Sequence, residues 1–343
     1  MKILHMLITD AFSGSESVAA HIIKNLPPEY KGIYTSPAGE AHNVCSSMGV
    51  DTLVCNTSDT GEIKRAFIES SADIVHAHDP HMSFNCARAG VPFISHLHCN
   101  CDWLKRICPN SLALAYTVKK AKRVLCVSSS IAEEYVFKSF MRDKQLCLPN
   151  CVDSREVIAK STAAILPENW DMAFIGRMSA PKQPVEFVRL VSLVKSKLPN
   201  VTAVMVGDGE LREAVEQAIE KYALSNSVTL VGYKENPYTY MRNSRVGVLT
   251  SAQEGFGLAA VEMMSLGKPF FAYPNGGLKD IVSGSCGGLY SSAEAMADAV
   301  VETLSDGSVY SAKSLGAYEA SRRFTDMTAY IAKLCAVYDS AVS

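Results

Sequence analysis

Two glutamates and two glycines fall within nine residues of one another, in the segment QEGFGLAAVE at residues 253–262. A strand-like apolar run precedes this segment, and a helix-like amphipathic run follows it. Gly255 and Gly257 would let backbone amides approach a ligand closely, and the amino end of a helix favours an anion. The carboxylates of Glu254 and Glu262 can accept hydrogen bonds from vicinal hydroxyls, as on a ribose or a hexose. The alternative is a helix-capping acid followed by a solvated acid.

Two basic residues follow another strand-like run. In FIGRMSAPKQP, residues 174–184, Arg177 and Lys182 fall in the loop after the strand. A guanidinium offers paired donors and an ammonium offers a mobile charge, so together they can hold a diphosphate, although two surface bases would give the same pattern. A third run ends in VGDG, where Gly207 and Gly209 flank an aspartate and a tight turn is the simpler explanation.

The composition limits the class of protein. The length of 343 residues suits two domains of about 150 residues each. A hydrophobic content of 48% is typical of a globular protein, and a net charge of −2 gives no reason to expect a nucleic acid as partner. The 11 scattered cysteines favour reduced thiols, and no apolar run approaches the roughly 20 residues that span a bilayer. We therefore expect a cytoplasmic protein.

Strand-like and helix-like patterns alternate through both halves of the chain, which predicts parallel sheets covered by helices on both faces. The periodicity lapses between Pro149 and Trp170, so the domain junction is expected there. In such α/β sheets ligands bind beyond the carboxyl ends of the strands. The runs that predict strands are KILHMLI, DIVHAHD, PFISHLH, RVLCVS and QLCLPN in the first half, and DMAFIGR, TAVMVGDG, VTLVGY, VGVLTS and PFFAYP in the second.

Four motifs occur in a fixed order in the second half. They are Gly-Arg…Lys, Val-Gly-Asp-Gly, Ser-x-x-Glu-Gly-Phe-Gly…Glu…Gly-x-Pro and Asn-Gly-Gly at residues 275–277. This arrangement resembles the retaining GT-B glycosyltransferases of family 4 (glycosyl transferases group 1), in which seven residues also separate the two glutamates. The resemblance implies two doubly wound Rossmann-like α/β domains facing across a cleft. It implies an acceptor-side domain at 1–155, a nucleotide-sugar domain at 156–324, and a C-terminal helix at 325–343 that packs back on the first domain.

The resemblance also implies roles for individual residues. Glu254 would contact the hydroxyls of the donor sugar and Glu262 the ribose, while Arg177 and Lys182 would neutralise the diphosphate as it leaves. The expected catalytic residues are His98, Glu254, Arg177 and Lys182. The expected donor-binding residues are Gly14, Arg177, Lys182, Gly207, Gly255, Phe256, Gly257 and Glu262.

The first half is a looser match to the same family. The segment FSGSESVAAHI resembles the glycine-rich first loop, but Ser13 replaces one of two adjacent glycines and Ser17 stands where a base is common. Gly14 is still expected to bring backbone amides near the donor phosphate, whereas the role of Glu16 stays open.

Histidines lie at two strand ends, IVHAHDPH and FISHLHCN, which resemble strand ends lining the cleft of the family. His98 best fits the histidine that faces the reacting sugar. Packing or hydrogen-bonded structural roles are expected for His76, His78 and His96. A zinc site is the alternative, with His96, His98, Cys99, Cys101 and Cys108 as ligands, but the spacing lacks paired Cys-x-x-Cys knuckles.

The predicted reaction moves a hexosyl or N-acetylhexosaminyl group with retention from a UDP-sugar, or as second choice a GDP-sugar. The acceptor would be a glycan, a lipid-linked sugar or a small molecule, in surface polysaccharide or glycoconjugate synthesis. No metal or other cofactor is required if the two cations neutralise the diphosphate. The alternatives are a nucleotide-sugar epimerase on the same fold and a non-catalytic partner subunit.

A basic, aromatic-containing stretch at residues 103–123 raises the further expectation of peripheral contact with anionic headgroups at the inner face of a membrane. A solvated helix face explains the same pattern. The residues concerned are Trp103, Lys105, Arg106, Lys119, Lys120, Lys122 and Arg123.

Overall fold

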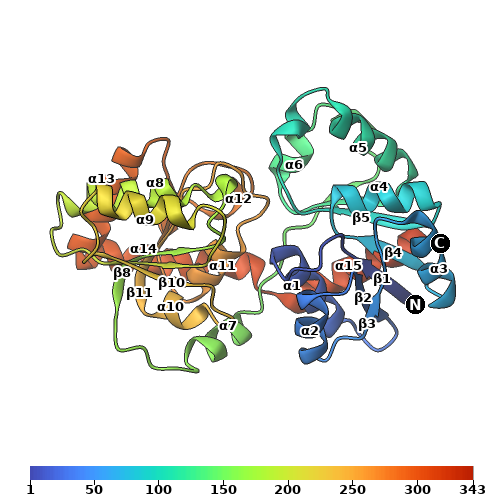
Figure 1. Ribbon diagram of the computed structural model, residues 1–343, viewed down its shortest axis with the longest axis horizontal. Helices are drawn as coiled ribbons and strands as arrows, with labels where there is room; N and C mark the ends of the chain where they lie inside the picture. Colours follow the sequence, from blue (N-terminus) through green and yellow to red (C-terminus); the bar gives the residue numbers. More distant parts are fainter. Residues whose placement is uncertain (343) are drawn as a thin grey trace. The chain divides into compact units, whose positions relative to one another are not determined.

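The structure is a computed structural model that describes residues 1–342, and it divides into two compact units (Figure 1). Unit 1 comprises Met1–Cys151 and the segment from Met327 onward, and unit 2 comprises Val152–Asp326. Helix α7 (Ser154–Ser161) occupies part of the stretch in which the sequence periodicity lapses. It escaped prediction because it is short and buries few side chains.

Unit 1 contains a seven-stranded sheet in the order β3-β2-β1-β4-β5-β6-β7, and all neighbouring strands are parallel. The order reverses between β1 and β4, as in a doubly wound sheet. Strands β2 and β3 were not predicted, because β2 mixes apolar with polar residues and β3 is only three residues long. The strands are β1 (Lys2–Met6), β2 (Lys31–Ser36), β3 (Thr52–Val54), β4 (Ile74–Ala77), β5 (Phe93–Leu97), β6 (Arg123–Cys126) and β7 (Gln145–Cys147).

Helices cover the sheet of unit 1, and the last helix of the chain is one of them. Figure 1 shows the red helix α15 beside the blue elements of unit 1, and α15 packs against α1. Its side chains Leu334 and Tyr338 are fully buried. The helices of unit 1 are α1 (Gly14–Asn25), α2 (Glu40–Ser47), α3 (Thr60–Glu69), α4 (Pro80–Ala89), α5 (Pro109–Lys120), α6 (Ser129–Glu134) and α15 (Met327–Val342), with short 3₁₀ turns η1 (Asp102–Lys105) and η2 (Lys138–Phe140).

Unit 2 contains a six-stranded parallel sheet in the order β10-β9-β8-β11-β12-β13. Its order reverses between β8 and β11, so the carboxyl ends of these two strands form the topological switch point of the sheet, where ligands bind in open α/β sheets. The strands are β8 (Trp170–Ile175), β9 (Ala203–Val206), β10 (Val228–Gly232), β11 (Ser244–Leu249), β12 (Phe270–Ala272) and β13 (Gly287–Leu289).

The helices of unit 2 cover both faces of its sheet. In Figure 1, α8 and α9 lie on one side of the strands, and α7 and α10 lie on the other. These helices are α7, α8 (Pro184–Lys195), α9 (Arg212–Lys221), α10 (Tyr238–Arg242), α11 (Leu258–Ser265), α12 (Leu278–Ile281), α13 (Ala293–Ser305) and α14 (Gly307–Ser321), with 3₁₀ turns η3 (Ala180–Lys182), η4 (Gly284–Cys286) and η5 (Arg322–Phe324). Two doubly wound α/β units confirm the predicted fold class. Within residues 1–342, no helix has the length and apolar character needed to cross a membrane.

The burial of α15 predicts that its inner face stabilises unit 1. Leu334→Ala should lower the free energy of unfolding by about 2–5 kcal/mol, because it removes a fully buried side chain and leaves a cavity. Val342→Ala, on the exposed face of the same helix, should change it by less than about 0.5 kcal/mol. Urea denaturation followed by circular dichroism measures both. Equal effects of the two substitutions would show that α15 is not part of the core.

Candidate functional site

The loops that follow β8 and β11 are hydrogen-bonded to each other in unit 2. The Ala252 amide donates to the carbonyl of Pro181 at 2.8 Å, and the Thr250 hydroxyl donates to the carbonyl of Gln183 at 2.9 Å. These bonds fix the two loops side by side at the switch point of the sheet. Residues that lie some 70 positions apart in sequence therefore meet there.

Lys182 and Glu254 form an ion pair across these two loops. The ammonium of Lys182 donates to Oε2 of Glu254 at 2.6 Å, and the Ser251 hydroxyl donates to the same oxygen at 3.3 Å. The two side chains are 27% and 10% exposed, so the pair is largely shielded from water. Sequence analysis gave these residues different ligands, whereas in the structure they neutralise each other. An incoming diphosphate would have to compete with Glu254 for Lys182.

Arg177 lies on the exposed side of the same loop. Its guanidinium contacts the carboxylate of Glu210 at 3.2 Å, and the two side chains are 74% and 52% exposed. An exposed pair of this kind contributes at most about 1 kcal/mol, so a ligand could release Arg177 easily. The same loop packs closely against Gly207, where an added Cβ would lie 2.0 Å from the carbonyl oxygen of Gly176. Gly207 therefore allows the loops after β8 and β9 to pack closely.

The Asn-Gly-Gly segment supports the loop that carries Glu254. The side-chain amide of Asn275 donates to the carbonyl of Ser251 at 2.8 Å, and the backbone amide of Gly277 donates to the carbonyl of Glu254 at 3.1 Å. Gly276 has a φ of +55°, and an added Cβ would lie only 1.6 Å from the carbonyl oxygen of Glu254. The backbone of this segment therefore touches the backbone of the glutamate loop directly.

Helix α11 begins immediately after the Gly-Phe-Gly segment, with Gly257 as its N-cap in the left-handed region at φ +111°. Its first amides lie at the end of the helix that favours an anion. Phe256 is buried and packs edge-on against Phe324, with ring centroids 5.5 Å apart. Phe256 can therefore offer a ligand its backbone but not its ring.

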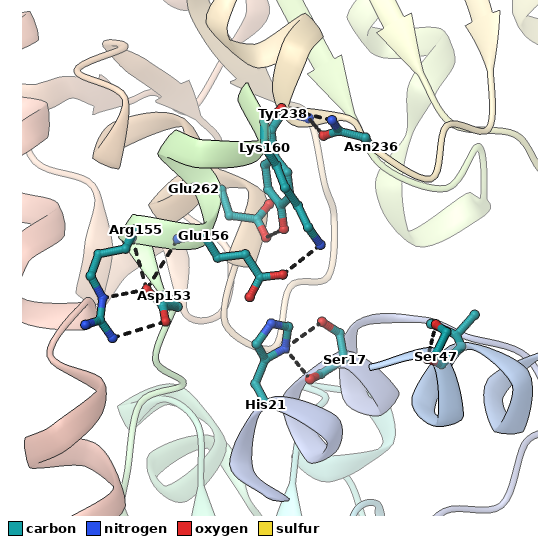
Figure 2. Close-up of polar contacts among 11 residues, drawn as sticks. Ser17, His21, Ser47, Asp153, Arg155, Glu156, Lys160, Asn236, Tyr238 and Glu262 are labelled. Carbon is teal, nitrogen blue, oxygen red and sulfur yellow. Dashed lines mark hydrogen bonds and ion pairs between the residues drawn. The ribbon is translucent and has the colours of Figure 1, made fainter. Parts of the chain in front are cut away.

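Glu262, in the middle of α11, is held by a residue that sequence analysis did not find. The hydroxyl of Tyr238, the first residue of α10, donates to Oε1 of Glu262 at 3.3 Å (Figure 2). The negative charge of Glu262, followed by burial and by the charge of Glu156, raises the pKa of Tyr238, which therefore stays protonated as a donor. Asn236 and Pro237 mark the start of a helix, but nothing local indicates a partner 24 residues away.

Helix α7 is tied to the same region (Figure 2). The side-chain amide of Asn236 donates to the carbonyl of Lys160 at 2.9 Å, and the Lys160 ammonium pairs with Glu156, one turn earlier, at 2.7 Å. Asp153 caps the helix by accepting from the amide of Arg155 at 3.0 Å. The helix thus brings a further carboxylate toward Tyr238.

In unit 1, the first loop is organised around Glu16. Its carboxylate accepts from the Ser13 amide at 3.1 Å, the Ser15 hydroxyl at 3.0 Å and the Thr9 hydroxyl at 2.9 Å. Ser13 is the N-cap of α1 and Gly14 is the first residue of that helix. The role left open for Glu16 is therefore a capping one, and the serine that replaces a glycine takes part in it.

His98 follows the end of β5 and is partly exposed. Its Nε2 lies 3.1 Å from Nδ1 of His78, and the loss of hydration within this group of rings lowers the pKa of His98 to about 3. The ring is therefore neutral near pH 7. The neighbouring Cys99 and Cys101 contact each other, with their sulfur atoms 3.2 Å apart. Cys108 contacts the carbonyl of Trp103 instead, so the structure does not gather the predicted cysteine and histidine ligands at one point.

Comparisons with known protein families divide the chain in a similar way. Residues 159–322 match the family described as Glycosyl transferases group 1, and residues 52–156 match Glycosyltransferase Family 4. Two curated relatives are an uncharacterized glycosyltransferase of Methanocaldococcus jannaschii, MJ1059, and the poly(glycerol-phosphate) alpha-glucosyltransferase of Bacillus subtilis. They are 30% and 27% identical over 140 and 162 residues, which is 39% and 46% of this chain. The matched stretches span only 34% and 24% of those proteins.

Solved structures confirm the fold. Anabaena Alr3699/HepE, crystallised with UDP and glucose, superposes with a TM-score of 0.85 at 19% identity, covering 99% of this chain and 100% of that one. The fold of the two units is therefore GT-B. Unit 2 also contains the match to the first of the two glycosyltransferase family models, and unit 1 contains nearly all of the match to the second.

The contact between Gly276 and the Glu254 loop predicts a strict requirement for glycine. Gly276→Ala should lower the free energy of unfolding by roughly 2 kcal/mol or more, because it adds both a clash and backbone strain. Gly284→Ala is the matched control, since nothing lies within 4 Å of its added Cβ. Thermal and urea unfolding of both variants measure the difference. A stability of Gly276→Ala equal to that of Gly284→Ala would contradict the described loop packing.

Proposed function

We propose that the protein transfers a hexosyl or N-acetylhexosaminyl group from a UDP-sugar to an acceptor hydroxyl, with retention of configuration. The observation that carries this proposal is the Lys182–Glu254 ion pair, in which a cation and a hydroxyl acceptor meet at the switch point of the sheet. HepE, which shares the fold, has been crystallised with UDP and with UDP-glucose, and this supports UDP as the first choice of donor nucleotide. GDP is the second choice.

In this proposal the diphosphate is the leaving group, and its developing charge must be stabilised. Lys182 leaves Glu254 and binds the phosphates, and Arg177 leaves Glu210 and binds them as well. The first backbone amides of α11 supply further hydrogen-bond donors. The two cations provide the charge compensation without a need for a divalent ion. Glu262, oriented by Tyr238, accepts from the ribose hydroxyls.

The release of Glu254 from Lys182 is the step that couples binding to chemistry. Once Lys182 binds the phosphates, the Glu254 carboxylate can accept hydrogen bonds from the sugar hydroxyls. It then orients the sugar for departure of the diphosphate. Glu254 acts here as a hydrogen-bond acceptor and not as a nucleophile. The diphosphate departs from, and the acceptor attacks, the same face of the sugar, which gives retention without a covalent intermediate. Gly14 and His98 stay candidates in unit 1 for phosphate and sugar contacts.

A glycan or lipid-linked acceptor is proposed, in the synthesis of a surface polysaccharide or glycoconjugate. One relative is named for poly(glycerol-phosphate), and another, from Campylobacter jejuni, is named for a diphospho-undecaprenol sugar. The basic 103–123 stretch carries exposed apolar side chains that support peripheral contact with an anionic membrane surface. These side chains are Ile107, Leu112 and Tyr116, which are 70%, 52% and 43% exposed.

Slow hydrolysis of donor sugars tests the proposal without knowledge of the acceptor. Water then takes the place of the acceptor: the bond between the anomeric carbon and the phosphate oxygen breaks, UDP leaves with the electron pair, and water supplies the hydroxyl. A panel of UDP- and GDP-sugars should give UDP and free sugar with at least one UDP-sugar. Lys182→Met should reduce this rate about ten- to a hundredfold, since a charge-assisted contact contributes roughly 1.5–3 kcal/mol.

Lys234→Met, which removes an exposed lysine of the same unit, is the control and should leave the rate unchanged. Release of a new nucleotide-sugar in place of free sugar would identify an epimerase. A protein that neither binds nor hydrolyses any member of the panel would be the non-catalytic subunit, and the proposal would be wrong.

Glu254→Gln should separate donor binding from turnover. Without the carboxylate, Lys182 is free, so UDP should bind up to about tenfold more tightly. Turnover should nevertheless fall at least about tenfold, because the sugar loses its orienting acceptor. Calorimetric titration with UDP and hydrolysis on the same preparation measure the two effects.

The control for this experiment is Glu210→Gln, which frees Arg177 from an exposed ion pair and should change UDP affinity less than about fivefold. If Glu254→Gln weakened UDP binding as much as Lys182→Met does, Glu254 would be a structural residue and the exchange of partners would be excluded.

A further inference from the structure

Five histidines gather on three adjacent strands at the core of unit 1. His5 lies on β1, His76 and His78 lie on and just after β4, and His96 and His98 lie on and just after β5. Residues two apart on a strand point to the same face, so the pairs on β4 and β5 present their rings together. All the rings except His98 are fully buried.

One hydrogen-bonded chain begins at α15. The hydroxyl of Tyr338 lies 2.7 Å from Nδ1 of His76, and Nε2 of His76 lies 3.0 Å from Nδ1 of His96. The chain stops there, because the buried Nε2 of His96 has no hydrogen-bond partner among residues 1–342.

A second chain runs beside the first. Nδ1 of His5 lies 3.0 Å from Nε2 of His78, and Nδ1 of His78 lies 3.1 Å from Nε2 of His98. The buried Nε2 of His5 is again without a partner in the described part of the chain.

Hydrogen bonding alone does not satisfy this cluster. A neutral imidazole carries one N–H and one lone pair, so every tautomer assignment leaves the Nε2 of His96 as a buried orphan donor or a buried orphan acceptor. A polar atom in that position is unfavourable by about 1–3 kcal/mol. A cluster of neutral rings with an unused lone pair is suited to a metal ion, which needs lone pairs from neutral imidazoles.

We propose that His78, His96 and His98 bind a zinc ion. One ring nitrogen from each lies within 4.8 Å of the other two. In a tetrahedral site with Zn–N bonds of about 2.0–2.1 Å, ligand nitrogens are about 3.3 Å apart. The His78–His98 nitrogens are already 3.1 Å apart.

The remaining contacts fit the second layer of a zinc site. With the lone pair of His96 Nε2 on the metal, its Nδ1–H donates to Nε2 of His76, whose Nδ1–H donates to the oxygen of Tyr338. With His78 Nδ1 on the metal, its Nε2–H donates to Nδ1 of His5. A ligating histidine usually donates its second nitrogen in this way. Each ring only changes tautomer, so binding requires no loss of a proton or an electron.

The exposure of the rings selects this triad over its neighbour. His5, His76 and His78 also bring ring nitrogens within 4.8 Å of one another, but all three are fully buried. His98 is partly exposed and gives an ion a route of entry. Three imidazoles leave the fourth position of the ion for water or another small ligand.

Metal binding by the full-length protein tests the proposal, and it does not depend on the transfer reaction. Chelator-treated protein should take one equivalent of Zn²⁺ from a chromophoric chelator. Co²⁺ in its place should give the visible absorption of a tetrahedral site without thiolate charge transfer. His98→Gln should weaken Zn²⁺ binding at least about a hundredfold. The exposed His81 gives the control, His81→Gln, which should bind as the wild type does.

Further variants test the second layer of the site and the nearby thiols. Tyr338→Phe should weaken binding about tenfold through His76, while Tyr30→Phe, which removes a hydroxyl bonded to Asp339 on the same helix, should not. Replacement of Cys99 and Cys101 by serine should leave binding intact. The proposal is overturned if the wild type takes up no Zn²⁺, if His98→Gln binds as well as His81→Gln, or if the cysteine variant is the one that loses the ion.

Discussion

The Lys182–Glu254 ion pair is the contact on which the candidate site depends. A cation and an anion at 2.6 Å, both largely shielded from water, stabilise each other only if their loops are held in register. The hydrogen bonds between the β8 and β11 loops provide that register, and the Asn-Gly-Gly backbone supports the loop from the other side. The two side chains therefore balance each other's charge. An anionic ligand has to attract the ammonium of Lys182 more strongly than Glu254 does, and this requirement favours a diphosphate over a single carboxylate.

The two glutamates of the motif differ in the charge of their hydrogen-bond partners. Glu254 is in a loop and pairs with a mobile ammonium, so it can change partner when charge arrives. Glu262 lies within a helix and accepts a hydrogen bond from Tyr238. Tyr238 is a neutral donor, so the charge of a bound phosphate does not draw it away from Glu262. One glutamate is therefore suited to a step that depends on ligand binding, and the other to a fixed contact.

Unit 1 shows a different use of polar residues in a core. Five histidines and Tyr338 occupy positions at or near the carboxyl ends of three central strands, where a purely apolar set would pack with less difficulty. Neutral rings in two chains satisfy most of their nitrogens, and one of the unsatisfied nitrogens belongs to His96, whose ring centroid lies 4.0 Å from that of the partly exposed His98. The arrangement is stable enough to keep these rings buried, yet it leaves lone pairs in the interior.

Much of the architecture could be predicted from the sequence, because alternating apolar runs and helical patterns report burial directly. Parallel sheets, the helix after Gly257 and the loop positions of Arg177 and Lys182 all follow from local pattern. Strands β2, β3 and β13 and helix α7 were missed. Strand β2 mixes apolar with polar residues, and three-residue strands and a helix with few buried residues carry little periodicity. Contacts between distant residues were also missed: no local signal pairs Tyr238 with Glu262, or shows that Lys182 meets Glu254.

A crystal structure of the protein with bound UDP would test the exchange of partners at Lys182 through the position of one nitrogen atom. We expect Nζ of Lys182 to leave Glu254 and to lie about 2.7–2.9 Å from an oxygen of the diphosphate. The Glu254 carboxylate would then keep its contact with Ser251 and turn toward the place of the sugar. A complex in which UDP is bound while Lys182 still contacts Glu254 at 2.6 Å, with the diphosphate held by other residues, would contradict this exchange.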